Sequence, residues 1–471
     1  MGFRFHRRKS LEGGFWAGRV TRRAGVRVFA LVAAVLLVLA APATSSRMRD
    51  GASDATAFDP SLASVDVGHS AVVQRDGKIV VAGISRRSHQ SEFALARYTT
   101  RGKLDSSFAR DGLLLTDVGR EADYSSVAAL AEQVDGKLIL AGGVYVDVSG
   151  YRGAFAVSRY RRRGALDTTF GRGGTVLTPY RKPRPGKFSL AYVSGVALQP
   201  DGRIVVAGTT TNITNVIRLA LARYTRTGTL DPTFGKRGKV EVEAGSLRGV
   251  VVRALALQRD GKIVVAGRKH LQGGSHFTIA RFTSRGAIDR SFGNDGRVTT
   301  VLGHESYAGA VAIQADGKIV AAGSVDSHLG LARYLASGLP DPDFGTDGTV
   351  LTDFALRSFS SPEIVIQPDG RIVVACSLDG PRRFGLGRYD VDGTLDPTFG
   401  EGAKVRTRFR AGSGARTVAL QRDGKIVAAG SAGGDFAVAR YTAGGTLDRS
   451  FGGDGRVTTP LGPAWLRRGG R

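Results

Sequence analysis

A short phrase, Asp-Gly followed by Lys or Arg and then an apolar run, recurs through this chain and constrains its fold more than any other feature. Its seven aspartates are Asp76, Asp135, Asp201, Asp260, Asp316, Asp369 and Asp423. Successive copies are 53 to 66 residues apart. Self-similarity at such a period is typical of propellers and solenoids, in which each copy is one supersecondary unit.

The fourth copy shows the segments of one unit most clearly. Four short stretches have the composition of strands: residues 253–258, 262–267, 277–282 and 296–300. The second is apolar on both faces and rich in β-branched residues, which favours a strand that is covered on both sides. The Asp-Gly pair before it predicts a tight hairpin, because Gly accepts positive φ without steric cost. No stretch after residue 58 has sustained helical periodicity, so we expect almost no helix.

Four strands in each of seven copies predict an all-β fold, a seven-bladed β-propeller of four-stranded antiparallel blades, over residues 58–460. A β-solenoid is the structural alternative, although its repeats are usually shorter. Residues 58–62 resemble a degenerate copy of the turn in each repeat, and we expect them to join the blade that closes the ring. Residues 461–471 form a basic C-terminal tail in this interpretation.

The first 43 residues have the organisation of a secretory signal peptide. Eight basic residues precede a 14-residue apolar run, Val28 to Ala41, which is followed by Pro42 and Ala43. We therefore expect export to the cell envelope or the medium, with cleavage near Ala43. An uncleaved N-terminal anchor is the alternative, and only that alternative would attach the protein to a membrane. Residues 44–57 are small and polar and predict a linker.

The chain is strongly basic, with a formal net charge of +26. Without residues 1–43, which hold eight basic residues and one acidic residue, the remainder keeps a net charge of +19. Such a charge suits an anionic partner. Basic residues are nevertheless spread over every repeat, and no nucleic-acid-binding motif is present. We expect a monomer whose partner is an anionic polymer, a glycan or a protein.

Each copy also contains an arginine at a fixed distance from two other residues. The arginines are Arg97, Arg159, Arg223, Arg281, Arg333, Arg388 and Arg440. An aspartate follows each after eight residues: Asp105, Asp167, Asp231, Asp289, Asp341, Asp396 and Asp448. A phenylalanine follows after eleven: Phe108, Phe170, Phe234, Phe292, Phe344, Phe399 and Phe451. The residue directly after each arginine is Tyr or Phe.

This constant set has two interpretations, seven metal or anion sites or one structural contact made seven times. We favour an Arg–Asp pair that ties the third strand to the following turn, with the two aromatic residues packed in the blade core. The planar guanidinium group can bridge a carboxylate and nearby carbonyl groups. No copy has the carboxylate density of a calcium loop, although Asp341, Asp343 and Asp347 come nearest. No metal and no cofactor is therefore expected.

Length varies only in two connections of each copy. From the turn glycine to the arginine the distance runs from 16 to 23 residues, and from the phenylalanine to the next turn glycine from 25 to 32. In an up-and-down blade these two connections emerge on one face, and variable loops on a constant scaffold usually carry binding. All six histidines after the leader, His69 included, are expected in or beside them. The candidate ligand-binding residues are His89, Tyr145, Tyr151, Arg181, His270, His276, His304, Tyr307, His328 and Arg382.

The repeat phrases Gln-x-Asp-Gly-Lys-Ile-Val-Val-Ala-Gly, Phe-Ala-Leu-Ala-Arg-Tyr and Gly-x-Leu-Asp-x-Ser-Phe resemble the delta-60 repeat of bacterial surface and secreted proteins. The resemblance runs from about residue 58 to 460, with small departures at Ala109 and Pro340. It implies an exported, propeller-like repeat protein. It implies no activity and no catalytic residue.

Two function classes remain open on the sequence, together with a purely structural role in the envelope. The favoured one is a secreted, non-enzymatic propeller that binds a polymer or a protein through its variable loops. The alternative is a polysaccharide lyase or hydrolase with scattered His, Tyr and Arg residues, since no nucleophile elbow, zinc motif or phosphate loop is present. The single cysteine, Cys376, follows an apolar run where other copies have Gly, which predicts a buried structural thiol.

Overall fold

The computed structural model describes ten stretches of the chain. They are residues 65–87, 90–118, 125–146, 152–180, 189–212, 216–242, 249–271, 273–357, 360–379 and 382–461. The expected signal peptide, the linker, the segment 58–62 and the tail beyond Leu461 lie outside these residues. All described strands belong to the unit Phe58–Arg471.

The described residues form 28 strands, four in each copy of the repeat. Blade 1 contains β1 (Val65–Val73), β2 (Ile79–Arg87), β3 (Gln90–Tyr98) and β4 (Leu113–Thr116). Blade 2 contains β5 (Ser125–Glu132), β6 (Leu138–Val146), β7 (Arg152–Tyr160) and β8 (Thr175–Pro179). Blade 3 contains β9 (Ser189–Leu198), β10 (Ile204–Asn212), β11 (Arg218–Tyr224) and β12 (Lys239–Glu241). Blade 4 contains β13 (Val250–Leu257), β14 (Ile263–Leu271), β15 (Gly274–Phe282) and β16 (Arg297–Thr300).

The last three blades repeat the same plan. Blade 5 contains β17 (Ser306–Ile313), β18 (Ile319–Val325), β19 (His328–Tyr334) and β20 (Thr349–Thr352). Blade 6 contains β21 (Glu363–Ile366), β22 (Ile372–Leu378), β23 (Arg383–Tyr389) and β24 (Lys404–Thr407). Blade 7 contains β25 (Ser413–Leu420), β26 (Ile426–Ala432), β27 (Asp435–Tyr441) and β28 (Arg456–Thr459).

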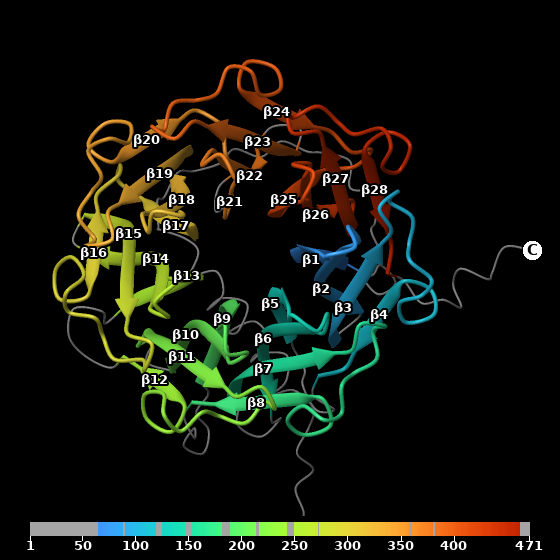
Figure 1. Cartoon of the computed structure of the whole chain (residues 1–471), viewed down its shortest axis with the longest axis horizontal. Helices are drawn as coiled ribbons and strands as arrows, with labels where there is room; N and C mark the ends of the chain where they lie inside the picture. The colour runs from blue at the N-terminus through green and yellow to red at the C-terminus, as the bar shows by residue number, and fades with distance from the viewer. Residues whose placement is uncertain are drawn as a thin grey trace, which may run out of the picture. The chain divides into compact units, whose positions relative to one another are not determined.

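The blades are antiparallel sheets arranged around a central axis, so the predicted seven-bladed propeller is confirmed (Figure 1). Within each blade the strands pair in chain order, with the first strand at the centre of the ring and the fourth at its rim. Blades 2 and 3 are also joined by one parallel bridge, between Arg152 and Ser189. Some strands are longer than predicted: β15 begins at Gly274 because its ladder with β14 continues to the pair Leu271 and Gly274.

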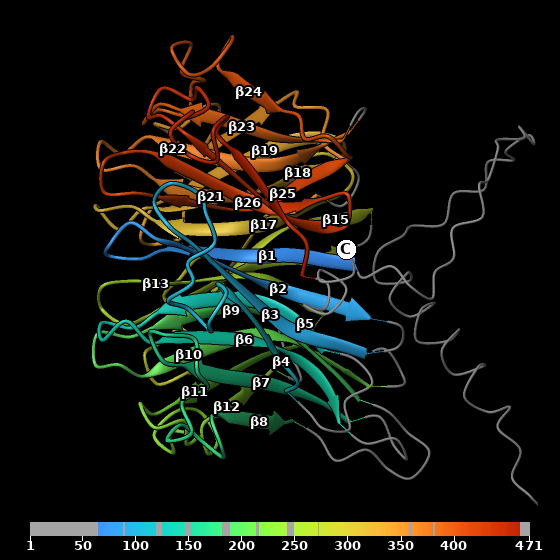
Figure 2. The same cartoon turned by 90° about the vertical axis from the view of Figure 1, so that its right-hand side faces the viewer.

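The two kinds of connection emerge on opposite faces of the disc, as the length pattern predicts. We call the face with the Asp-Gly turns and the turns between third and fourth strands the turn face. The opposite face, with the variable connections, is the loop face. Figure 1 looks onto the turn face, which lies at the left in Figure 2.

The repeat arginine joins each blade to the next. Arg97 Nε donates to Asp105 Oδ2 at 2.8 Å, and its Nη1 donates to the carbonyl oxygen of Arg162 in blade 2 at 2.5 Å. The guanidinium carbon also lies 4.6 Å from the centre of the Phe108 ring. Lys78 of the Asp-Gly-Lys turn approaches Asp105 to 3.0 Å. We call this set, with its equivalents in the other blades, the Arg–Asp clasp.

The clasp makes Asp105 a strong acid. Burial by itself would raise the pKa of this carboxyl group, but hydrogen bonds from Ser107 and Lys78 and the charge of Arg97 lower the pKa to about 2. The pair is therefore ionised at neutral pH, as the sequence interpretation requires. That interpretation needs one correction. The aromatic residues lie between neighbouring blades rather than inside one blade, since Phe292 packs in one cluster with Tyr334 of blade 5.

The same contacts close the ring between blade 7 and blade 1. Arg440 Nη1 donates to the carbonyl oxygen of Thr100 at 2.5 Å, and Gly452 N donates to that of Arg101 at 2.9 Å. The hydroxyl of Tyr98 donates to Thr459 Oγ1 at 2.9 Å. Among the described residues each blade is built from one continuous stretch of chain, and the contacts that join blade 7 to blade 1 are made by side chains and turns.

We expect the substitution Phe292→Ala to lower the free energy of unfolding by about 3–5 kcal/mol, because the ring is fully buried between two blades. The measurement is a urea-unfolding midpoint. Leu339→Ala is the control, since that side chain is 60% exposed. An unchanged midpoint for the Phe292 variant would contradict the interblade role of this ring.

Candidate functional site

The first strand of most blades carries a β-bulge, eight residues before its turn glycine. In β13, Val252 pairs with Gly267 and Ala254 with Ala266, so Arg253 has no partner in the ladder. A bulge turns the extra side chain in a new direction. The described bulge residues are His69, Ala128, Ser194, Arg253, Gly309 and Arg416.

The bulge explains the glycine of the repeat phrase Val-Ala-Gly. It pushes a carbonyl group of the first strand toward the second strand. A Cβ atom on Gly267 would lie 1.9 Å from the carbonyl oxygen of Val251, which no side chain can tolerate. The equivalent glycine in blade 1, Gly83, has the same relation to Val67 at 1.9 Å. A bulge in the first strand therefore requires glycine at the facing position of the second strand.

Blade 6 lacks the bulge, and it is the blade that has no glycine at this position. Pro362 occupies the place of the bulge residue, and β21 begins after it at Glu363. Cys376 replaces the glycine without a clash, and its Sγ lies 3.6 Å from the carbonyl oxygen of Gly385. Burial raises the pKa of this thiol far above its ordinary value. The predicted buried structural thiol is confirmed by its complete burial.

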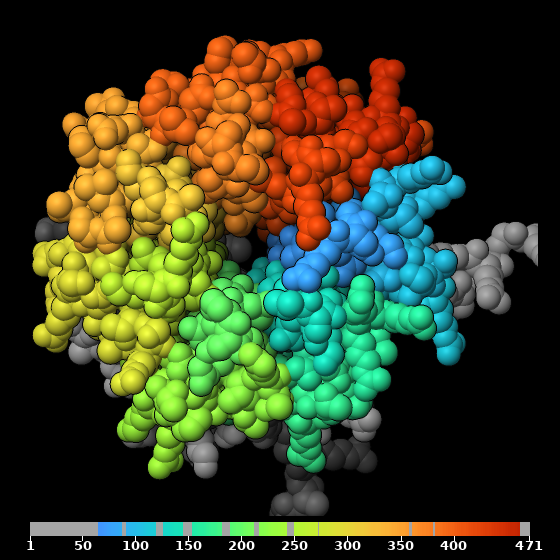
Figure 3. Space-filling view, in the orientation of Figure 1, coloured from blue at the N-terminus to red at the C-terminus, as the bar shows by residue number. Residues whose placement is uncertain are grey.

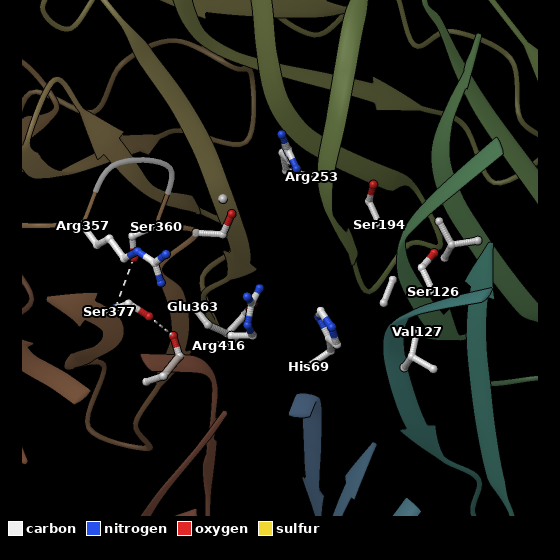
Figure 4. A pocket seen from close by; sticks show the side chains of 15 residues that line it. His69, Ser126, Val127, Ser194, Arg253, Arg357, Ser360, Glu363, Ser377 and Arg416 are labelled. Atoms are coloured by element: carbon white, nitrogen blue, oxygen red, sulfur yellow. Dashed lines mark hydrogen bonds between the residues drawn. The ribbon is translucent and has the colours of Figure 1, made fainter. Parts of the chain in front are cut away.

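The bulge residues converge on a central cavity of about 520 Å³ (Figure 4). The surface of the turn face is also hollowed where the inner strands meet (Figure 3). The charged and titratable residues that line the cavity are His69, Arg253, Arg357, Glu363 and Arg416. Serines and small apolar residues supply the rest of the lining.

Arg357 reaches the axis by a different route from the bulge residues. It lies in the connection between β20 and β21, which belongs to the loop face. Its backbone N donates to the carbonyl oxygen of Ser377 at 3.1 Å, and Ser377 N donates to Ser360 Oγ at 3.1 Å. Tyr307 donates its hydroxyl to the carbonyl oxygen of Ser360 at 2.7 Å. These bonds hold residues of the connection against the cavity on its loop-face side.

The cavity arginines differ from the clasp arginines in having no acidic partner. Within the described part of the chain, the side chains of Arg253, Arg357 and Arg416 form no ion pair or hydrogen bond. Desolvation and the charge of Arg357 lower the pKa of Arg416. Desolvation and the charge of Arg268 lower the pKa of Arg253. Guanidinium groups nevertheless stay charged in proteins. Their positive charge is therefore concentrated in the cavity and is not neutralised by an ion pair.

The other two titratable groups are shifted in opposite directions. Desolvation and the charge of Arg416 lower the pKa of His69 to about 3, so its imidazole is neutral at physiological pH. Desolvation raises the pKa of Glu363 to about 7, with a smaller opposing effect from the Ile364 backbone. Glu363 is therefore partly protonated near neutrality and only partly offsets the arginine charge.

The lining is asymmetric. Arg357, Arg416 and Glu363 lie together on one side of the cavity, and Ser126 and Ser194 lie on the other (Figure 4). Val127 and Val193 accompany the two serines. Such a cavity can bind an anionic group on one wall and a neutral, hydroxyl-bearing or apolar group on the other. Among the described residues no three His, Cys, Asp or Glu side chains form a metal-binding group.

The candidate residues from the sequence do not line this cavity where they are described. His270, His304, His328 and Arg382 are exposed on or beside loop-face connections. His276 and Tyr307 are buried, and Tyr307 holds the blade 6 connection. Only the backbone of Tyr145 is described, in β6. His89, Tyr151 and Arg181 lie outside the described residues.

The candidates chosen from the sequence miss the cavity because most of its lining residues lie on strands and not in the variable connections, although Arg357 and Ser360 belong to one such connection. His69 was expected in or beside one of them, but it lies at the bulge of β1 and faces the axis. A signal was present: the position eight residues before the turn glycine carries His or Arg in three copies, although strand residues around it are largely apolar. The bulge that turns this side chain toward the axis is marked in the sequence only by the glycine of the paired strand.

The pattern of one protein family matches the chain. It is described as "Domain of unknown function (DUF5122) beta-propeller" and covers residues 74–108, 133–170, 199–234, 258–292, 314–344, 367–399 and 421–451. A comparison with curated proteins gives no match. No helix among the described residues is long and apolar enough to cross a membrane.

Several solved structures are similar in fold. A protein of unknown function from Dyadobacter fermentans has 12% identity and a TM-score of 0.42, over 82% of this chain and 93% of that one. An ulvan lyase has 12% identity and a TM-score of 0.44, over 85% and 97%. A puromycin hydrolase mutant has 16% identity and a TM-score of 0.48, over 86% of this chain and 56% of that one. These similarities carry no argument about activity.

The link between bulge and glycine predicts that Gly267→Ala lowers the free energy of unfolding by about 3 kcal/mol, through overpacking against Val251. Cys376→Ala, the equivalent position in the blade without a bulge, should cost only about 1 kcal/mol. Urea-unfolding midpoints of the two variants test the comparison. Equal losses at the two positions would show that the bulge does not require the glycine.

Proposed function

The chain belongs to the DUF5122 β-propeller family, and on that basis we propose that it is a binding protein that holds an anionic ligand in its central cavity. One observation carries the proposal: three arginines surround a cavity of about 520 Å³ and have no acidic partner within the described residues. The same chain pairs every clasp arginine with an aspartate.

Unpaired positive charges close to one another are electrostatically unfavourable, and a bound anion would remove that cost. Carboxylate, sulfate and phosphate groups all match the planar donors of arginine. The opposite wall, with Ser126 and Ser194, suits hydroxyl groups. An acidic sugar has both kinds of group. We therefore favour an acidic polysaccharide, or a fragment of one, as the ligand.

The wider setting is part of the same proposal. The repeat phrases support membership of the delta-60 type, and residues 1–43 support export to the bacterial envelope or the medium. A polymer whose acidic unit enters the cavity from the loop face would continue across His270, His304, His328 and Arg382. The exposure of these four side chains supports a role for the loop face in binding.

A second candidate, a lyase or hydrolase that acts on an acidic polysaccharide, is favoured by Glu363. A carboxyl group with a pKa of about 7 can give and accept a proton at neutral pH. Neutral His69 in the same cavity is a further proton acceptor. Under this alternative the protein shortens a polyuronate chain, and Glu363→Gln stops the cleavage while binding persists. A constant chain length in the presence of protein opposes the alternative.

The binding proposal predicts saturable binding of small anions by the protein without residues 1–43. Isothermal titration at constant ionic strength with sulfate, citrate and glucuronate measures it. We expect Arg416→Ala to weaken binding about tenfold, the loss of one charge-assisted contact of about 1.4 kcal/mol. Arg422→Ala, an exposed arginine of the turn face, is the control and should have no effect. Absence of saturable binding, or an unaffected Arg416 variant, would refute the proposal.

A dependence on pH follows from Glu363. Its pKa of about 7 means that the side chain gains a proton as the pH falls from 8 to 6, which removes a negative charge from the cavity. We expect sulfate to bind about tenfold more tightly at pH 6 than at pH 8, on the order of 1.4 kcal/mol for one charge at this range. Sulfate keeps its own charge over this interval, and His69 stays neutral. Glu363→Gln should abolish the dependence, and its persistence in that variant would assign the effect elsewhere.

A further inference from the structure

The turn face carries charge very unevenly around the ring, although its loops have one constant geometry. In blades 1 to 3 the connection between the third and fourth strands holds exposed arginines at both of its turns. We define the basic arc as six of them: Arg101, Arg110, Arg162, Arg172, Arg226 and Arg237. The three blades are neighbours in the ring, so the six arginines belong to consecutive blades (Figure 1).

The fold does not require arginine at these positions. In blades 5 to 7 the second turn of the same connection holds Asp347, Glu401 and Asp454 and no arginine, whereas in blade 1 the aspartate at that turn, Asp111, stands beside Arg110. The corresponding first turns of blades 6 and 7 contain Asp392 and Gly444. The seven copies of this loop can be compared with one another at equivalent positions. The comparison shows that the loop conformation does not require the arginines that blades 1 to 3 carry.

Two arginines of the arc also adopt a backbone conformation that disfavours them. Arg110 has φ of 80° and Arg237 has φ of 54°. The residues at the position of Arg237 in blades 4 and 5 are Asp295 and Asp347, with φ of 50° and 49°. Aspartate tolerates positive φ better than arginine does, because its short side chain bonds locally. Arginine is kept here in spite of a backbone cost, which is typical of functional positions.

The arc arginines have no acidic partners within the described residues. Arg226 donates only to the carbonyl oxygen of Asp201. No ion pair neutralises their charges, and a ligand with repeated negative charges would be attracted to the arc.

We propose that the basic arc binds an extended anionic polysaccharide along the turn face of blades 1 to 3. The chemistry of the arc distinguishes this partner from others. No exposed large hydrophobic side chain among the described residues is aromatic, so the arc offers no platform for nucleic-acid bases. Leu339 and Val391, exposed in the turns between third and fourth strands, lie in blades 5 and 6. In the described turn-face connections of blades 1 to 3 the large exposed apolar residue is Val134, and one valine gives little apolar surface to enter a lipid layer.

This site is separate from the central cavity and does not depend on the function proposed for it. The arc lies on the turn face, whereas the cavity is lined on its loop-face side by Arg357 and Ser360 of a loop-face connection. Arg416→Ala should therefore leave binding at the arc unchanged, and failure of the cavity proposal would leave this one standing.

The test uses heparin, a sulfated polysaccharide, as the probe in surface-based binding at several salt concentrations. The arc variant combines Arg110→Glu, Arg172→Glu and Arg237→Asp. The control variant combines Arg290→Glu, Arg422→Glu and Arg449→Glu, three exposed arginines outside the arc and outside the proposed polymer path, and changes the net charge equally. We expect the arc variant to lose at least tenfold in affinity and to show a weaker salt dependence, because fewer counterions are exchanged. The control should lose less than threefold, and both variants should melt at the parent temperature.

Three results would overturn the proposal. Equal losses in the arc and control variants would mean that net charge alone attracts heparin. Tighter binding of single-stranded DNA than of heparin at matched salt would assign the arc to nucleic acid. Binding to phosphatidylglycerol vesicles without binding to heparin would assign it to a lipid surface.

Discussion

The rest of the structure depends on the Arg–Asp clasp. Each clasp arginine holds its own blade's aspartate with Nε and a carbonyl group of the next blade with Nη1, as Arg281 does with Asp289 and Ala336. A buried, charge-assisted contact made in every blade fixes the angle between neighbouring blades, because a movement of either blade would break hydrogen bonds of the buried arginine. The same contact, from Arg440 to Thr100, joins blade 7 to blade 1.

A rigid ring allows a second feature to vary. The bulge places one side chain of most inner strands at the axis of the ring. The fold does not restrict which residue type occupies these positions. The occupants are unequal: His69, Arg253 and Arg416 bring titratable or charged groups, whereas Ala128 and Gly309 bring little. Blade 6 departs most, because Pro362 removes the bulge and its preceding connection supplies Arg357 instead. Asymmetry of this kind can give a symmetric fold one oriented binding site.

The contrast between paired and unpaired arginines separates structure from function in this chain. The constant arginines are structural, as their single spacing predicts, because one spacing implies one geometry. The remaining basic residues are scattered along the chain, but several of them lie on equivalent turns of neighbouring blades. Arg172 lies 62 residues after Arg110, and Arg237 lies 65 residues after Arg172, yet the three arginines occupy the same turn in adjacent blades. A list of loop residues could not show this gathering, since equivalent positions become neighbours only when the blades are placed side by side.

The sequence by itself determined the number of blades, the four strands of each, the faces on which constant and variable connections emerge, and the structural role of the Arg–Asp pair. These follow from local periodicity and from spacing, which the chain repeats seven times. Only the tertiary structure decided that the clasp spans two blades, that Cys376 is tolerated because blade 6 has no bulge, and that His69, Glu363 and three arginines share one cavity. The physical reason is that these relations depend on closure of the ring, which brings together inner strands far apart in sequence without leaving any local pattern.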